Sequence, residues 1–138
     1  MRLVEGLRAD GEVTVGNYDY FWFDLDRFLE KFSYEIAVTP KTGNPDLVLS
    51  LNSSNEFPDR ETNDYISESE FSTDSIIVDS AMVKDYYKKV QWDSKNMARR
   101  VRRVYIGVYT KVDSKCTFSV MVTKRHEFSP ILMLNGQS

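Results

Sequence analysis

Few residues in this chain are of the kinds that build disulfides, zinc sites or membrane spans. Its 138 residues include one cysteine and one histidine, so an internal disulfide is excluded and the usual zinc ligands are missing. No apolar run approaches the roughly 18 to 20 residues of a membrane-spanning helix. The net charge of −3 is too small to steer the chain toward nucleic acid or an anionic membrane. We therefore expect no nucleic-acid partner and no membrane insertion.

The sequence also lacks the common catalytic motifs. It contains neither the G-x-S-x-G motif of α/β-hydrolases nor the glycine patterns of phosphate-binding loops. Cys116 alternates with apolar residues of an expected strand, which favours a buried and inert thiol. The chain is therefore expected not to be an enzyme, and a hydrolase that uses His126 is the remaining catalytic alternative.

What the chain does contain is many apolar and aromatic residues in strand-like patterns. Hydrophobic residues make up 41% and aromatic residues 13%, which is enough for a globular domain. Residues 34–51 predict two strands, because apolar residues recur at every second position on both sides of a turn that contains Pro40, Gly43 and Pro45. We interpret this stretch as a central hairpin.

Further strand patterns surround the hairpin, over residues 12–15, 18–25, 74–79, 100–112 and 116–122. Residues 80–98 fit either a short helix or an irregular loop. The spacing of strands and turns predicts an all-β fold, a jelly-roll-like antiparallel β-sandwich of about six to eight strands over residues 11–124. Residues 1–10 are expected to be a linker or N-terminal extension, and residues 125–138 a C-terminal strand or linker.

Three blocks, in this order, resemble the bacterial pre-peptidase C-terminal domain. They are NYDYFWFDL (17–25), YEIAVTPKTGNPDLVLSL (34–51) and VYIGVYTKVDSKCTFSVMV (104–122). The resemblance implies a β-sandwich that serves as an accessory module of a larger, secreted or cell-surface protein and usually carries no catalysis. Some relatives of this kind bind collagen, polysaccharide or other insoluble substrates. The implied partner is a protein or polysaccharide surface, or a neighbouring domain of the same parent protein.

Calcium is the one cofactor that the resemblance raises, since some relatives bind it through an acidic cluster just before the first strand. Here that region offers only Glu5, Asp10, Glu12 and Asn17, without a recognisable spacing, and calcium is not expected there. The middle segment, 53–99, is also longer and more charged than in the family.

A second calcium candidate lies in the acidic stretch 59–70. Its spacing follows a twelve-residue calcium loop, although Asp64 stands where such a loop needs glycine and no helices are expected around it. The alternative is a solvated acidic loop without metal. The candidate ligands are Asp59, Glu61, Asn63, Tyr65 and Glu70.

Aromatic residues suggest a binding surface. Tyr20 and Trp22 alternate with core-facing phenylalanines, and Tyr105 and Tyr109 do the same on a later strand. If the two strands are neighbours, the four rings form a strip that suits sugars or peptides, because rigid aromatics give large contact area at low entropic cost. Alternatively, a loop or a neighbouring domain covers the strip.

Arg100, Arg102 and Arg103 form a basic patch that suits an acidic partner or phosphate, or that is solvated and protects a strand edge. Asp46, directly after Pro45, is either a cap of the turn, a metal ligand or a surface contact. The function expected from the sequence is a non-catalytic binding or interaction module. A calcium-binding adhesion module that uses residues 59–70 is the alternative.

Overall fold

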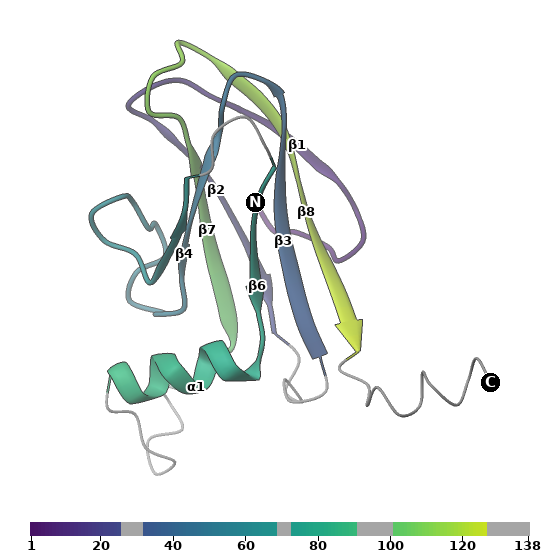
Figure 1. The fold of residues 1–138 in the computed structure, drawn as a ribbon, viewed down its shortest axis with the longest axis vertical. Coiled ribbons are helices and arrows are strands. Elements are labelled where there is room, and N and C mark those ends of the chain that lie inside the picture. Colours follow the sequence, from purple (N-terminus) through teal and green to yellow (C-terminus); the bar gives the residue numbers. More distant parts are fainter. Residues whose placement is uncertain (26–31, 69–72, 91–100, 127–138) are drawn as a thin grey trace, which may run out of the picture.

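Two four-stranded antiparallel sheets form the protein (Figure 1). The computed structural model describes residues 1–25, 32–68, 73–90 and 101–126. Sheet A has the order β2-β7-β4-β5 and sheet B the order β1-β8-β3-β6. This is a jelly-roll arrangement, so the predicted all-β sandwich is confirmed. The elements are β1 (Ala9–Val13), β2 (Tyr18–Asp24), β3 (Phe32–Thr42), β4 (Asp46–Ser50), β5 (Tyr65–Ser67), β6 (Asp74–Val78), α1 (Ser80–Lys89), β7 (Arg103–Tyr109) and β8 (Cys116–His126).

Strands that follow one another mostly lie in opposite sheets. The expected central hairpin is therefore wrong, because β3 belongs to sheet B and β4 to sheet A. A bulge between Pro40 and Thr42 interrupts the pairing of β3, and Gly43 turns the chain at a φ of 74°. A side chain at Gly43 would also overlap the Sγ of Cys116. The consecutive strands β7 and β8 likewise lie in opposite sheets.

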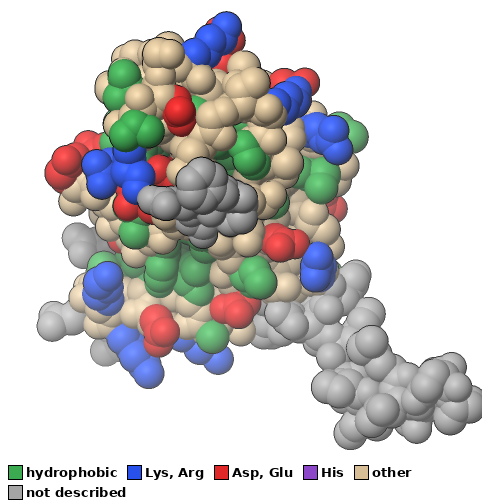
Figure 2. All heavy atoms as spheres, turned by 45° about the horizontal axis from the view of Figure 1, so that its top comes forward, with side chains coloured by type: hydrophobic (Ala, Val, Ile, Leu, Met, Phe, Trp, Pro, Cys, Tyr) green, Lys and Arg blue, Asp and Glu red, His purple; other side chains and the backbone are tan. Residues whose placement is uncertain are grey.

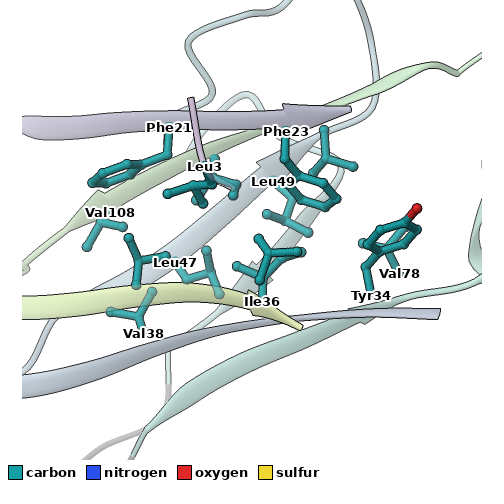
Figure 3. Close-up of a cluster of buried hydrophobic side chains, with 14 of the residues drawn as sticks. Leu3, Phe21, Phe23, Tyr34, Ile36, Val38, Leu47, Leu49, Val78 and Val108 are labelled. Carbon is teal, nitrogen blue, oxygen red and sulfur yellow. The ribbon is translucent and has the colours of Figure 1, made fainter. Parts of the chain in front are cut away.

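The core lies between the two sheets (Figure 3). Leu47 and Leu49 of sheet A and Ile36 and Val38 of sheet B are fully buried. The apolar faces of β3 and β4 thus contribute to the same core from opposite sheets. The two sheets also meet through edge-to-face packing, as in Phe21 on Phe118.

Strand β4 is buried on both faces, which is unusual for an antiparallel sheet. Its inward residues are part of the core, but Val48 and Ser50 on the outward face are also 0% exposed. The outer face of sheet A is therefore covered where β4 lies, and the covering segment shapes the site described below.

The first residues pack on the sandwich. Leu3 is 3% exposed, and its backbone N–H donates to the carbonyl of Trp22 at 2.8 Å. Arg2 forms a parallel bridge with Trp22, and Ala9 opens β1. The segment before β1 thus extends the edge of β2.

Helix α1 resolves part of the ambiguity over residues 80–98, of which 91–98 lie outside the described residues. The Asp79 side chain caps the helix by accepting from the N–H of Met82, and Val83 and Tyr86 are buried against the sandwich. Figure 1 shows the helix lying across one end of the sandwich. Among the described helices, none is long and apolar enough to cross a membrane.

Candidate functional site

The outer face of sheet A brings the four predicted aromatic residues together. In the β2–β7 register Trp22 lies opposite Tyr105, and Tyr20 opposite Gly107, two residues from Tyr109. The exposure of the rings is uneven, because Tyr105 and Tyr109 are buried whereas Tyr20 and Trp22 are half-buried. The strip is thus partly covered and partly exposed to solvent. It lies between the two alternatives of the sequence analysis, an exposed binding strip and a covered one.

A loop of residues 52–64 crosses this face and covers its middle. Phe57 packs edge-on against Tyr20 with ring centroids 5.1 Å apart. The crossing depends on Gly107, because a Cβ there would lie 2.9 Å from the carbonyl oxygen of Pro58 and 2.9 Å from Val48. Because Gly107 has no side chain, it interrupts the row of aromatic rings and lets the loop contact the sheet backbone.

The acidic residues of this loop fold the loop itself. An Oδ of Asp59 accepts from the N–H groups of Glu61 and Thr62, at 3.0 and 2.6 Å. The Asn63 amide donates to the carbonyls of Asp59 and Arg60, at 2.9 and 3.0 Å. Such Asx-type bonds replace the glycine-based turn of a calcium loop.

The described members of the predicted calcium set do not fit that loop. Tyr65, expected to offer its carbonyl, instead pairs within β5 opposite Leu49, and its hydroxyl donates to the carbonyl of Met82. Within the described ranges, no three His, Cys, Asp or Glu residues form a group that could hold a metal ion. Glu70 lies outside the described residues, so its role stays a prediction.

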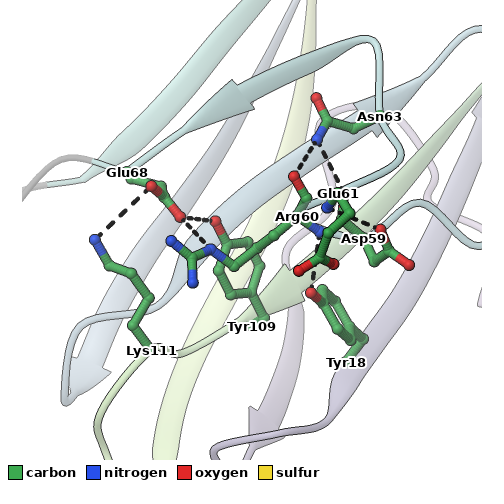
Figure 4. Close-up of polar contacts among 8 residues, drawn as sticks. All are labelled: Tyr18, Asp59, Arg60, Glu61, Asn63, Glu68, Tyr109 and Lys111. Atoms are coloured by element: carbon green, nitrogen blue, oxygen red, sulfur yellow. Dashed lines mark hydrogen bonds and ion pairs between the residues drawn. The ribbon is translucent and has the colours of Figure 1, made fainter.

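Beside Tyr109 lies a charged network that sequence reasoning did not find (Figure 4). The Glu68 carboxylate accepts hydrogen bonds from the hydroxyl of Tyr109 and from the Nε–H of Arg60, the latter at 3.0 Å. The Nζ of Lys111 lies 3.8 Å from the same carboxylate. The Tyr109 hydrogen bond, together with both cations, lowers the pKa of Glu68. Burial, and then Glu68, raise the pKa of Tyr109. Glu68 is thus held as a carboxylate and Tyr109 as a phenol.

A pocket of about 160 Å³ opens next to this network. Its lining includes Tyr18, Arg60, Tyr109 and Lys111, together with the turn between β1 and β2. The hydroxyl of Tyr18 accepts from the backbone N–H of Arg60 at 3.1 Å, which fixes the loop against β2. Of these four lining residues, Tyr109 was singled out in the sequence as a binding candidate, whereas Tyr18, Arg60 and Lys111 were not, since the loop crossing brings Arg60 to the other three.

The opposite end of the aromatic strip is flanked by arginines. The Arg103 guanidinium carbon lies 3.8 Å from the centre of the Trp22 ring, and that of Arg2 lies 5.7 Å from it. Arg103 also bonds Asp24 at 2.8 Å. Of the predicted basic patch, Arg103 therefore belongs to this face, Arg102 is exposed, and Arg100 lies outside the described residues.

Asp46 does not cap its turn through its side chain. It is 0% exposed, and neither carboxyl oxygen receives a hydrogen bond from a described residue. Burial, and then the carboxyl of Asp74 in the other sheet, raise its pKa to about 7. In this part of the protein a proton on Asp46 is favoured, since two buried carboxylates in contact repel one another.

Comparisons with known proteins identify the fold. No family model matches the chain, and no curated protein matches it. Eleven chains of solved structures match. One is the pre-peptidase C-terminal domain of a collagenase from Bacillus anthracis, with a TM-score of 0.55 and 14% sequence identity over 88% of this chain and 92% of that chain. The resemblance predicted from the sequence is confirmed at the level of the fold.

Proposed function

We propose that this chain is a non-catalytic interaction module of a larger protein, which recognises a protein or polysaccharide surface through the outer face of sheet A. The structural neighbour supports the coarser part of this proposal, because it is a C-terminal domain attached to a peptidase. The finer part rests on the residues of this face. The sandwich acts as a rigid scaffold, and recognition is left to the face and to the loop that crosses it.

The observation that carries the proposal is the open half of the aromatic strip. Phe57 is 66% exposed although it packs on Tyr20, and Tyr20 shares the outward side of β2 with Trp22. The three rings form a ridge, here called the aromatic ridge, that is anchored at its base and open to solvent. Anchored aromatic side chains lose little entropy on binding and contribute much of the energy of binding sites.

Arginines at one end of the aromatic ridge add polar contacts. Arg2 and Arg103 stack near Trp22, and Arg103 is already held by Asp24. Stacked guanidinium groups keep N–H donors free for a partner while their planes cover an aromatic ring. The combination of rings and donors suits both peptide and sugar surfaces. The mixed charges on the face that Figure 2 presents provide no field of one sign for nucleic acid.

The proposal is tested by measuring binding to a panel of immobilised fibrous proteins and insoluble polysaccharides, by co-sedimentation of the purified chain. Phe57→Ser is the test variant, because the exposed ring can be removed without emptying the core. Ile77→Ser in β6 is the matched control, since Ile77 is 53% exposed and lies in the other sheet. We expect Phe57→Ser to weaken binding about tenfold and Ile77→Ser to leave it unchanged. Equal affinity of both variants and the parent chain would overturn the proposal.

A further inference from the structure

We propose that the pocket beside Tyr18 is a carboxylate-binding site, which receives an acidic side chain of the protein partner. The site comprises Arg60, Lys111, Tyr109 and Tyr18, all of which line the pocket. This inference deepens the proposed function, because it names the chemical group that the partner places at this end of the face.

The same donors already hold a carboxylate of the chain itself. Glu68 accepts from Arg60 Nε and from the hydroxyl of Tyr109, and it forms an ion pair with Lys111. These donors come from the loop, from β7 and from the residues after β7, so the fold assembles them at one place. Figure 4 shows Arg60 and Lys111 converging on Glu68 from different segments. The donors therefore suit the geometry of a carboxylate.

Glu68 does not use all the hydrogen-bond donors of Arg60 and Lys111. A guanidinium carries five N–H groups, and the bond to Glu68 uses the Nε–H of Arg60. Lys111 carries three N–H donors and lies 3.8 Å from Glu68, so its contact is an ion pair longer than a hydrogen bond. Among the described residues, Arg60 and Lys111 both face the single carboxylate of Glu68, so one positive charge remains beside the pocket when Asp46 carries a proton.

The volume of the pocket suits the end of a single side chain. The pocket has a volume of about 160 Å³, whereas sites for drug-sized ligands take roughly 300 to 1,000 Å³. One water occupies about 30 Å³ of the liquid, so the pocket admits the few heavy atoms at the end of a side chain. A protein partner that inserts one Asp or Glu side chain fits this volume.

Neighbouring charges set the best conditions for a test. Asp46 lies near Lys111 and Glu68, and burial together with Asp74 raises its pKa to about 7. At pH 6 Asp46 is therefore mostly protonated and does not cancel the charge of Lys111. Glu68 remains ionised at this pH, because its pKa is lowered from 4.5.

The test is an amide NMR titration of the full chain at pH 6 with N-acetyl-glutamate α-amide, which carries a single carboxylate. N-acetyl-glutamine α-amide is the neutral control. We expect saturable shifts at residues 15–18 and 109–111 with a dissociation constant of about 1 mM, as befits one functional group. The glutamine probe is expected to cause none. Equal shifts with both probes would overturn the inference.

Variants separate binding from a merely structural role of the network. Glu68→Gln removes the competing carboxylate, so we expect the glutamate probe to bind about fivefold more tightly. Arg60→Gln removes a donor and is expected to weaken binding at least about tenfold, while Arg103→Gln, at the other end of the face, leaves it unchanged. Unaltered or weaker binding by Glu68→Gln would contradict the inference.

Inorganic phosphate serves as the competing anion. If phosphate saturates the pocket and the glutamate probe does not, the carboxylate assignment is overturned. None of these outcomes bears on the aromatic ridge, whose role is decided by Phe57→Ser, so failure of this inference and failure of the proposed function are distinguishable.

Discussion

Asp46 at the start of β4 meets Asp74 at the start of β6, so that two fully buried carboxyl groups, one from each sheet, face each other. Neither oxygen of Asp46 receives a hydrogen bond from the described residues while it is ionised. A single proton would turn the contact into a hydrogen bond between the sheets. Lys111 and Glu68 are the other charged groups that act on Asp46, with opposite signs.

The Asp46–Asp74 contact predicts that stability falls as pH rises. Asp46 titrates near 3.8 in the unfolded chain and near 7 in the folded one, so between these values only the folded state keeps the proton. Its contribution is therefore fully present below about pH 4 and lost as the pH passes 7, by at most about 1.4 kcal/mol per pH unit. Urea unfolding at pH 5, 6, 7 and 8 measures this slope. Glu68, whose pKa is lowered, acts in the opposite sense only below about 4.5.

Asp46→Asn provides the matched variant for this slope, because the amide is neutral at every pH and can donate to Asp74. We expect the variant to show a flatter dependence between pH 5 and 8. Asp10→Asn is the control, since Asp10 is exposed and forms an ion pair with Lys41. If the unfolding free energy of Asp46→Asn falls with pH as steeply as that of the parent chain, Asp46 and Asp74 do not share a proton.

A second prediction concerns the loop crossing at Gly107. In Gly107→Ala the new methyl group would lie 2.9 Å from the Pro58 carbonyl oxygen, which is backbone and cannot rotate away. We expect a loss of about 1 to 3 kcal/mol of unfolding free energy, the usual cost of overpacking. Ser75→Ala on the exposed side of β6 is the control. An unchanged urea midpoint in Gly107→Ala would show that the loop does not press on the sheet.

The sequence predicted which residues form strands and which side of each strand is buried better than it predicted which strands pair. The alternation at Ile36 and Val38 and again at Leu47 and Leu49 correctly predicted strands and their buried faces. It did not predict strand partners, because a period of two fixes which side of a strand faces the core but not which strand lies beside it. The Gly43 turn therefore looked like a hairpin although it joins two sheets.

For the candidate site, too, local sequence patterns were predictive and long-range contacts were not. Tyr20 and Trp22 were found because they alternate with core residues on one strand, whereas the Arg60–Glu68 pair forms only when the loop has crossed sheet A and β5 has paired with β4. Asp74 was missed because its contact with Asp46 spans the sandwich. Long-range contacts of this kind leave no local pattern in a single sequence.

A third prediction concerns Tyr109→Phe. The substitution removes the hydroxyl that holds Glu68, and this hydrogen bond is the main cause of the lowered pKa of Glu68. We therefore expect the pKa of Glu68 to rise, as measured by NMR of the glutamate side-chain carboxyl carbon. The loss of a hydrogen bond to a charged group should also cost about 1.5 to 3 kcal/mol at pH 7. A Glu68 pKa equal to that of the parent chain would contradict the network.

Calcium provides a fourth prediction. The Asp59 carboxylate is engaged by two backbone N–H groups and Tyr65 is fixed in β5, so these two candidate ligands, both among the described residues, are already committed to other contacts. We expect the same melting temperature in EDTA and in millimolar calcium. Binding at a hundredfold excess over the dissociation constant would add about 2.7 kcal/mol, which a melt detects easily. A clear rise that is lost in Glu70→Ala would favour the calcium-dependent adhesion module.

The most direct test of the binding face is amide NMR mapping of the chain with whichever member of the co-sedimentation panel, in soluble fragment form, binds most tightly. We expect the shifted amides to cluster on β2, β7 and the loop of residues 52–64, around Phe57, Tyr20 and Trp22. Shifts concentrated on the outward side of sheet B, around β3 and β8, would contradict a binding role for sheet A.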